Sequence, residues 1–297
     1  MIKPGLTLHR LELFLAVLDH GGVGRAARAR HISQPAVTEH LKGLEAYFGV
    51  PLFERFGRTV RPTPGARLLE PYARRTVGLM RSAEQAAAQY RGLEGGILTV
   101  GASTTPGTYL VPAALGKFHH THPAVTLRLR IGDSRDVEQW VAAGETDLGV
   151  IGDAPLALGL LAEPWVEDEL VVIVARGHRL ARRRTLPAAA LVAEAYVARE
   201  DGSSTRGVAE RFLAGIGLAL KPAMELGSPE ALREAVAAGL GVAIVSRHAV
   251  LARDRRIVAL RIAGGHWKRD LLIVRREEAP LSPAAARFRE LLLAGRR

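Results

Sequence analysis

At 297 residues, with 48% hydrophobic and 24% charged residues, the chain is long enough to form two or three globular domains. It has no cysteine, which excludes disulfides, thiolate catalysis and thiol-based redox sensing, and it has no apolar run long enough to span a membrane. The net charge is +11, and residues 1–95 carry 14 Lys and Arg against 8 Asp and Glu, so the densest positive charge favours a polyanionic partner near the N-terminus.

Two short helices are predicted first. Residues 8–22 show apolar positions at helical spacing and end at a pair of glycines. Residues 23–31 form the second helix, in which Ala26 and Ala27 are small enough for a close helix crossing. Two charged residues interrupt the apolar start and no small-residue cleavage site follows, so we expect a cytoplasmic protein and not a secreted one.

A third helix is predicted over residues 33–49. Its apolar residues recur at helical spacing and should form one buried stripe: Val37, Leu41, Leu44 and Phe48. Ser33 is a suitable N-cap, and a proline in the first turn removes an N–H that has no partner there. The residues left at the exposed front end are Gln34, Pro35, Thr38, Glu39 and Lys42.

Residues 51–63 follow as a predicted basic wing with a glycine at its turn. Its arginines are spaced along the segment: Arg55, Arg58 and Arg61. Helix, turn, helix and wing together are typical of a DNA-binding domain, here over residues 1–63.

The front of the third helix has the chemistry that reads bases. The amide of Gln34 suits adenine N6 and N7, the hydroxyl of Thr38 either donates or accepts, and the ring of Pro35 suits a thymine methyl. A carboxylate at Glu39 accepts from cytosine N4. Ser33 and the helix N-terminus suit a phosphate, and the wing arginines suit the backbone or the minor groove. A protein-packing bundle with a capped helix is the alternative.

Residues 64–95 are predicted to form a long helix and a glycine-rich hinge. The helix begins with a threonine cap and a first-turn proline. Residues spaced alternately by three and four then form the seam of two packed helices: Leu69, Tyr72, Thr76, Leu79, Ala83, Ala86 and Tyr90. We expect dimerisation through this seam, with a helix lying on its own domain's core as the alternative.

From residue 96 onward, predicted strands and helices alternate, which is typical of parallel sheets covered by helices. Two such units predict two small α/β lobes. The first covers about residues 96–166 and 267–297, and the second covers about residues 167–266.

Small polar residues follow three of the predicted strands: Ser103, Thr104 and Thr105; Ser203, Ser204, Thr205 and Arg206; and Ser228. Hydroxyls and helix N-termini at the carboxyl ends of strands form anion sites, although each cluster alone also fits a plain N-cap. We predict that Arg206 holds the negative charge of a bound ligand. Its pairing with Glu200 or Asp201 on its own loop is the alternative.

Other chemistry finds little support. His119, His120 and His122 have no cysteine or nearby carboxylate to complete a metal site, so we expect no metal. No nucleophile stands at a recognised spacing from a base, and no phosphate-binding P-loop is present, so we expect neither catalysis nor a cofactor beyond a small-molecule ligand.

The stretch AARARHISQPAVTEHLKGLEAYFGVPLFERFGRTVRPTPGA resembles the N-terminal domain of LysR-type transcriptional regulators. The resemblance implies an α/β chain with a winged helix-turn-helix, a linker helix, and a two-lobed effector domain similar to periplasmic binding proteins. It further implies homodimers or homotetramers on double-stranded DNA with interrupted inverted repeats, and leaves contact with RNA polymerase open. GASTTPGTYLVP and AREDGSSTRG resemble the subgroup of Calvin-cycle operon and sulfur-metabolism regulators.

The sequence therefore predicts a cytoplasmic DNA-binding regulator whose activity depends on a small anionic effector bound between two lobes. A solute-binding protein and a small-molecule enzyme on the same two-lobed fold are the alternatives. A solute-binding protein would not carry a recognition helix or a linker helix, and the enzyme would need a catalytic set that the sequence lacks.

Overall fold

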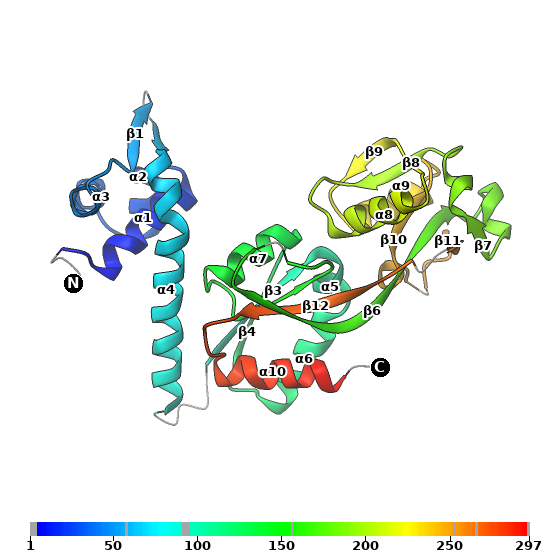
Figure 1. Ribbon diagram of the computed structural model, residues 1–297. Helices are drawn as coiled ribbons and strands as arrows, with labels where there is room; N and C mark the ends of the chain where they lie inside the picture. The colour runs from blue at the N-terminus through cyan, green and yellow to red at the C-terminus, as the bar shows by residue number, and fades with distance from the viewer. Residues whose placement is uncertain are drawn as a thin grey trace. The chain divides into compact units, whose positions relative to one another are not determined.

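A computed structural model of the chain describes residues 5–56, 59–90, 96–155, 157–251, 253–264 and 267–295 (Figure 1). It divides into two compact units, one of residues 1–87 and 143–145 and another of residues 88–142 and 146–297. Among the described residues, no helix combines the length and the hydropathy that a membrane crossing requires.

The first unit contains the predicted helix-turn-helix and wing: α1 (Leu8–His20), α2 (Val23–Ala29), α3 (Gln34–Phe48), β1 (Phe53–Phe56), β2 (Thr59–Pro62) and α4 (Pro64–Tyr90). Thr7 caps α1 by accepting from the N–H of Arg10, and Gly21 ends it in the left-handed conformation at φ 63°. Ser33 caps α3 as predicted, accepting from the N–H of Ala36 at 3.2 Å. Local signals therefore predict these helix ends correctly, whereas α2 ends at Ala29, two residues before the predicted residue 31.

The core of the first unit joins α1 to the other helices. Leu13, Phe14 and Leu44 are fully buried, and Ala26 of α2 belongs to the same core and is also fully buried. The prediction for Phe48 is wrong, because its side chain is 38% exposed. Phe48 lies in the last turn of α3, and its ring packs edge-on against Tyr47 instead of entering the core.

The second unit contains a first lobe, a second lobe and the strands between them: β3 (Ile97–Ser103), α5 (Thr104–Tyr109), α6 (Val111–Thr121), β4 (Thr126–Gly132), α7 (Ser134–Ala142), β5 (Leu148–Ile151), β6 (Leu160–Ala175), η1 (Arg179–Arg182), β7 (Thr185–Pro187), η2 (Ala188–Leu191), β8 (Tyr196–Arg199), α8 (Ser204–Gly215), β9 (Pro222–Leu226), α9 (Pro229–Ala237), β10 (Ala243–Ser246), η3 (Arg247–Ala249), β11 (Ile257–Ala263), β12 (Lys268–Arg276) and α10 (Pro283–Ala294).

The sheets are mixed, which corrects the prediction of parallel sheets. In the first lobe β3 pairs in parallel with β4 and β5, as predicted, but β12 pairs antiparallel with both β5 and β6. In the second lobe β8 and β9 are parallel, whereas β10 and β11 pair antiparallel with β6. The antiparallel pairs join segments that lie far apart in the chain, so a local sequence pattern does not predict them.

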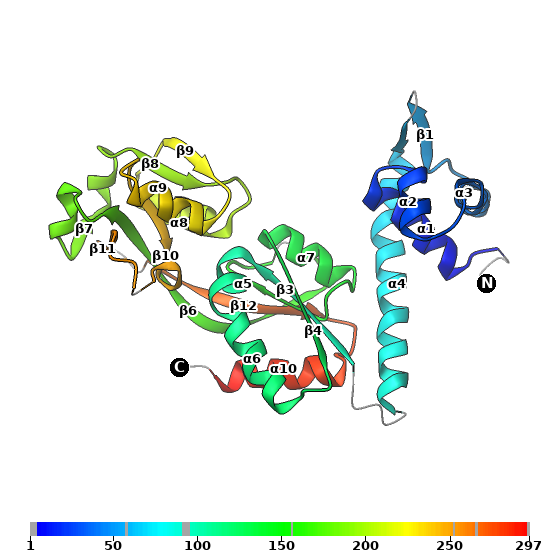
Figure 2. The ribbon, with the colours of Figure 1, turned by 180° about the vertical axis from the view of Figure 1, so that it is seen from behind.

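Strands β6 and β12 run from one lobe into the other (Figure 1). Trp165 in the first half of β6 belongs to the core of the first lobe, and Leu170 in its second half belongs to the core of the second. Helices α6 and α10 lie side by side over the first lobe, as Figure 2 shows from behind. Trp267, which lies just before β12 at the predicted start of the returning first-lobe segment, packs with the core of the second lobe.

Candidate functional site

The residues predicted to read DNA lie together on the front of α3. Gln34, Glu39 and Lys42 are exposed. Thr38 is half-buried, and its hydroxyl donates to the backbone oxygen of Gln34 at 3.0 Å. The Gln34 amide lies over α2, where a Cβ added to Gly24 would stand 2.9 Å from Gln34 Nε2. The lack of a side chain at Gly24 leaves the space that the amide occupies.

A groove of about 630 Å³ runs between α2, α3 and the hairpin β1–β2. Gln34, Thr38 and Lys42 line it from α3, and Arg28 lines it from α2. Arg25 also lines it, but its guanidinium donates to the backbone oxygens of the α1–α2 turn and so supports the turn itself. The groove therefore carries an amide, a hydroxyl and cations on one concave surface, together with the carboxylates of Glu45 and Glu54.

The wing is only partly described. Strands β1 and β2 pair antiparallel, with Glu54 opposite Arg61 and Arg55 opposite Val60. Arg61 is exposed. Arg58 lies outside the described residues, and only the backbone of Arg55 is described.

The long helix α4 has one face on its own core and exposes large apolar side chains on another. Ala73 and Val77 are buried against the core, and Leu69 also packs there, although the sequence placed it in the seam. Tyr72 and Leu79 are 62% and 59% exposed. Ala83 is exposed as well, and the side chain of Ala86 lies outside the described part of the chain. Large apolar side chains exposed in a row indicate a partner surface.

In the second unit, strand ends from the two lobes meet at one cavity. The parallel strands β3 and β4 end side by side at Ser103 and Gly132, and β8 ends at Arg199 from the other lobe. The cavity holds about 10 Å³, close to the minimum for one water molecule. Its lining residues are Ser103, Thr104, Thr105, Asp133, Ser134, Arg199, Glu200, Ser203, Ser204 and Thr205. Two of the three predicted clusters thus lie on the same cavity.

Two hydroxyl groups that line this cavity form no hydrogen bond with the described residues. Ser103 Oγ and Ser134 Oγ are buried and have no hydrogen-bond partner among the described residues. Ser103 stands at the N-cap of α5 without capping it, so the plain N-cap alternative does not account for this residue. Ser203, in contrast, does cap α8, accepting from the N–H of Arg206 at 3.5 Å. Buried polar groups are nearly always satisfied, so unpaired hydroxyls facing a cavity indicate a ligand.

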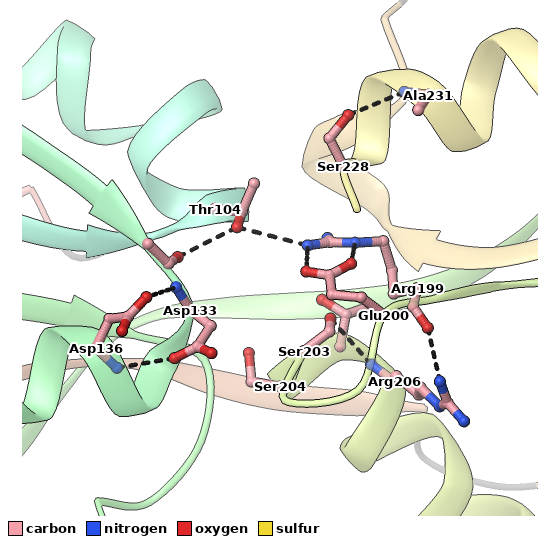
Figure 3. Close-up of polar contacts among 12 residues, drawn as sticks. Thr104, Asp133, Asp136, Arg199, Glu200, Ser203, Ser204, Arg206, Ser228 and Ala231 are labelled. Atoms are coloured by element: carbon pink, nitrogen blue, oxygen red, sulfur yellow. Dashed lines mark hydrogen bonds and ion pairs between the residues drawn. The ribbon is translucent and has the colours of Figure 1, made fainter. Parts of the chain in front are cut away.

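Arg199, which was not among the predicted site residues, brings a cation to the cavity (Figure 3). Its side chain is only 4% exposed, and its guanidinium donates to both oxygens of Glu200, at 2.7 and 2.6 Å. The same guanidinium reaches Thr104 Oγ1 of the first lobe at 3.5 Å. An arginine at the end of a buried strand, followed by the predicted serines, was the signal available in the sequence.

Arg206 and Ser228 do not line the cavity. The Arg206 guanidinium donates to Glu210 at 2.8 Å and to Glu225 at 3.0 Å. It also donates to the backbone oxygen of Arg199, as Figure 3 shows. It pairs with neither acid of its own loop that was considered as an alternative. Ser228 caps α9, accepting from the N–H of Ala231 at 3.1 Å, as a plain N-cap does.

A buried ion pair lies beside the cavity, on the paired strands β6 and β12 that connect the two lobes. Arg269 and Asp168 stand opposite each other in register, 6% and 0% exposed, with 3.0 Å between Arg269 Nη2 and Asp168 Oδ2. Burial lowers the pKa of Arg269, and the charge of Asp168 opposes that shift. Neither residue was among those predicted from the sequence.

A second polar contact joins the lobes away from the cavity. Tyr109 of α5 donates its hydroxyl to Glu230 of α9 at 2.6 Å and accepts from Arg233 at 3.4 Å. Burial, followed by the hydrogen bond to Glu230, raises the pKa of Tyr109 to about 12. Separation of the lobes along this edge would therefore break a hydrogen bond to a charged group.

Two models of known protein families match this chain, one near its N-terminus and the other over the rest of the chain. Residues 8–67 match the model described as "Bacterial regulatory helix-turn-helix protein, lysR family", and residues 91–297 match "LysR substrate binding domain". The chain belongs to the LysR family of transcriptional regulators. It is thus a member of a family of DNA-binding regulators and not of enzymes.

RuBisCO operon transcriptional regulators are among the relatives. The RuBisCO operon transcriptional regulator of Allochromatium vinosum is 34% identical over 97% of this chain and 96% of its own. A crystal structure of full-length CbnR complexed with its target DNA matches with a TM-score of 0.69 at 26% identity, over 97% of this chain and 99% of that one. The regulatory domain of Synechocystis CcmR in complex with 2-PG matches with a TM-score of 0.63 at 28% identity, over 67% of this chain and 96% of that domain.

Proposed function

We propose that this regulator binds a small anion, carrying a phosphate or carboxylate group, in the cavity between its lobes, and that the anion changes its binding to DNA. The observation that carries the proposal is the combination of the buried Arg199 with the unpaired hydroxyls of Ser103 and Ser134 on one cavity. A guanidinium and several hydroxyl donors are the groups that bind oxyanions in proteins. The complex of the CcmR domain with 2-phosphoglycolate, a small anion, supports the same class of ligand.

Glu200 competes with such an anion in this proposal. Its carboxylate accepts hydrogen bonds from two nitrogens of the Arg199 guanidinium, Nε and Nη2. A bound phosphate or carboxylate would be held by the same pair of donors. The free volume of about 10 Å³ is too small for a phosphate. Entry of the anion therefore requires Glu200 to leave Arg199, the lobes to separate, or both. Since a ligand shifts a conformational equilibrium only by binding its states unequally, this exchange gives the anion a means of acting.

A thermal-shift titration of the full chain tests the proposal, with 2-phosphoglycolate, glycolate and inorganic phosphate as probes. At a hundred times its dissociation constant, a ligand that binds only the folded protein adds about 2.7 kcal/mol to the free energy of unfolding. We expect stabilisation by at least one of the three, together with a change in affinity for operator DNA. Absence of stabilisation by all three at 10 mM would contradict the anion site.

For DNA we propose that Gln34 reads a base while Arg61 contacts the backbone. Replacing Gln34 by alanine should cost about 1–3 kcal/mol on the preferred operator and relax discrimination at one base pair, because a base-edge contact is lost. Arg61→Ala should instead weaken binding to all sequences and reduce the slope of log K against log salt by about 0.9 if one phosphate contact is lost. Fluorescence anisotropy on matched and scrambled duplexes measures both. Equal, sequence-independent losses from the two variants would contradict these roles.

We also propose that the protein works as an oligomer, through the exposed face of α4, and that it acts in the cytoplasm, where its DNA lies. The exposed Tyr72, Leu79 and Ala83 support the oligomer.

A further inference from the structure

The buried pair of Arg269 and Asp168 touches the ligand cavity through two of its hydroxyls. Arg269 Nη2 donates to Thr205 Oγ1 at 3.0 Å, and Arg269 Nη1 donates to Ser204 Oγ at 3.3 Å. Both hydroxyls line the cavity, and Figure 3 shows Ser204 there beside Asp133 and Ser203. The arginine itself does not line it.

These contacts determine how the two hydroxyls can hydrogen-bond. A hydroxyl has one O–H donor and two acceptor lone pairs, and a guanidinium can only donate. Because Arg269 takes up an acceptor position on each oxygen, the hydrogens of Ser204 and Thr205 must point elsewhere, and the cavity is the polar space that they line. The arginine thus occupies one acceptor position on each hydroxyl and leaves its hydrogen to donate to a group in the cavity.

The arginine is itself held tightly on both lobes. It pairs with Asp168 of β6, which also accepts from Ser246 Oγ at 2.6 Å, and it donates to the backbone oxygen of Gly152 at the end of β5. A Cβ added to Gly152 would stand 2.7 Å from Ser204 Oγ and 2.8 Å from Arg269 Nη1, so the backbone approaches as closely as only a glycine allows. Asp168 neutralises the charge of the arginine, so the contribution of Arg269 is orientation and not net positive charge.

We propose that Arg269 is a positioning residue of the anion site: it orients the hydroxyls of Ser204 and Thr205 as donors to the bound anion. This inference rests on the proposed function, because it requires an anion in the cavity. It differs from the role of Arg199, which contacts the anion directly.

The variants are designed so that no lone charge is left in the interior. Arg269→Met alone would strand the buried Asp168, so it is combined with Asp168→Asn, which keeps an acceptor for Ser246. Thr205→Val removes one oriented hydroxyl at nearly constant volume. The matched control is Arg289→Met with Glu163→Gln, an arginine–carboxylate pair that joins α10 to β6 in the first lobe away from the cavity.

Calorimetric titration of the full chain with 2-phosphoglycolate measures the dissociation constant for each variant. We expect about a tenfold loss of affinity or more from Thr205→Val and a larger loss from the Arg269–Asp168 double variant, while the control stays within twofold. The two losses should not add: in the double-variant background, Thr205→Val should change affinity by less than about threefold, because its hydroxyl is no longer oriented. A merely structural role would give additive losses.

The outcomes are distinguishable. If the unsubstituted protein does not bind 2-phosphoglycolate, glycolate or inorganic phosphate, the proposed function fails and this inference fails with it. If it binds and Arg199→Met weakens binding, while the Arg269–Asp168 variant binds normally or the losses add, only the positioning role is overturned. Should the double variant not fold, Arg269→Lys replaces it in the same cycle. Lysine keeps the charge but loses the planar guanidinium. If Arg269→Lys binds the anion with the affinity of the unsubstituted protein, the inference is also overturned.

Discussion

Replacing Arg199 by methionine is expected to weaken binding of a small anion about ten- to a hundredfold. A hydrogen bond from a buried guanidinium to an anion contributes about 1.5–3 kcal/mol, and methionine retains much of the apolar volume while removing every donor. Arg199 is 4% exposed, so water does not replace those donors. Titration calorimetry with 2-phosphoglycolate measures the loss.

Two matched variants sharpen this result. Arg206→Met removes an arginine seven positions along, whose guanidinium is bound to Glu210 and Glu225 outside the cavity lining. We expect it to retain the affinity for the anion. Glu200→Gln should raise that affinity, because a neutral amide competes less well for the Arg199 fork. A loss in Arg206→Met with none in Arg199→Met would favour the role first predicted for Arg206 and contradict that of Arg199.

Leu79→Glu is expected to break the oligomer and, with it, most of the affinity for an inverted repeat. The side chain is 59% exposed on the face of α4 away from its own core, so the change leaves the fold of the monomer intact. In a packed seam the same change would place like charges across an apolar surface. Loss of the second half-site contact then lowers affinity by about 10²–10⁴-fold, since binding is no longer bivalent.

Multi-angle light scattering and binding to operators with one or two half-sites measure the two effects. The matched control is Arg81→Gln, which makes the same change in net charge at an exposed position of the same helix. At 100° per residue, it points away from the seam. If Leu79→Glu keeps the native mass and binds the paired half-sites normally, the seam is not the oligomer interface.

In the first unit, helix caps and helical spacing predict most of α3 but not where its buried stripe ends. The cap at Ser33, the first-turn proline and the buried Val37, Leu41 and Leu44 all act within a few residues of one another, so the sequence predicts α3 and its exposed front correctly. Phe48 continues the same period yet is exposed, because periodicity does not say where the neighbouring core ends. Leu69 likewise fits the seam by spacing but packs on its own core.

In the second unit, the predicted pairing fails where it depends on distant segments. The parallel pairs β3–β4 and β8–β9 follow from strand–helix alternation. Strand β12 lies between β5 and β6 because its apolar residues, Leu271 and Ile273, fill the core of the first lobe from nearly the end of the chain. That long-range packing makes the sheet mixed.

By itself, then, the sequence determined the winged helix-turn-helix, the long helix, the two-lobed architecture and the family, because capping, helical period and motif spacing are local properties. Only the tertiary structure decided which cation faces the cavity. Arg199 and Arg206 are both arginines at the junction of β8 and α8, and the sequence favoured the one in the helix. The fold turns Arg199 inward toward Thr104 of the other lobe and leaves Arg206 to Glu210 and Glu225. The direction of a side chain depends on what packs around it, and here those partners come from other strands and from the opposite lobe.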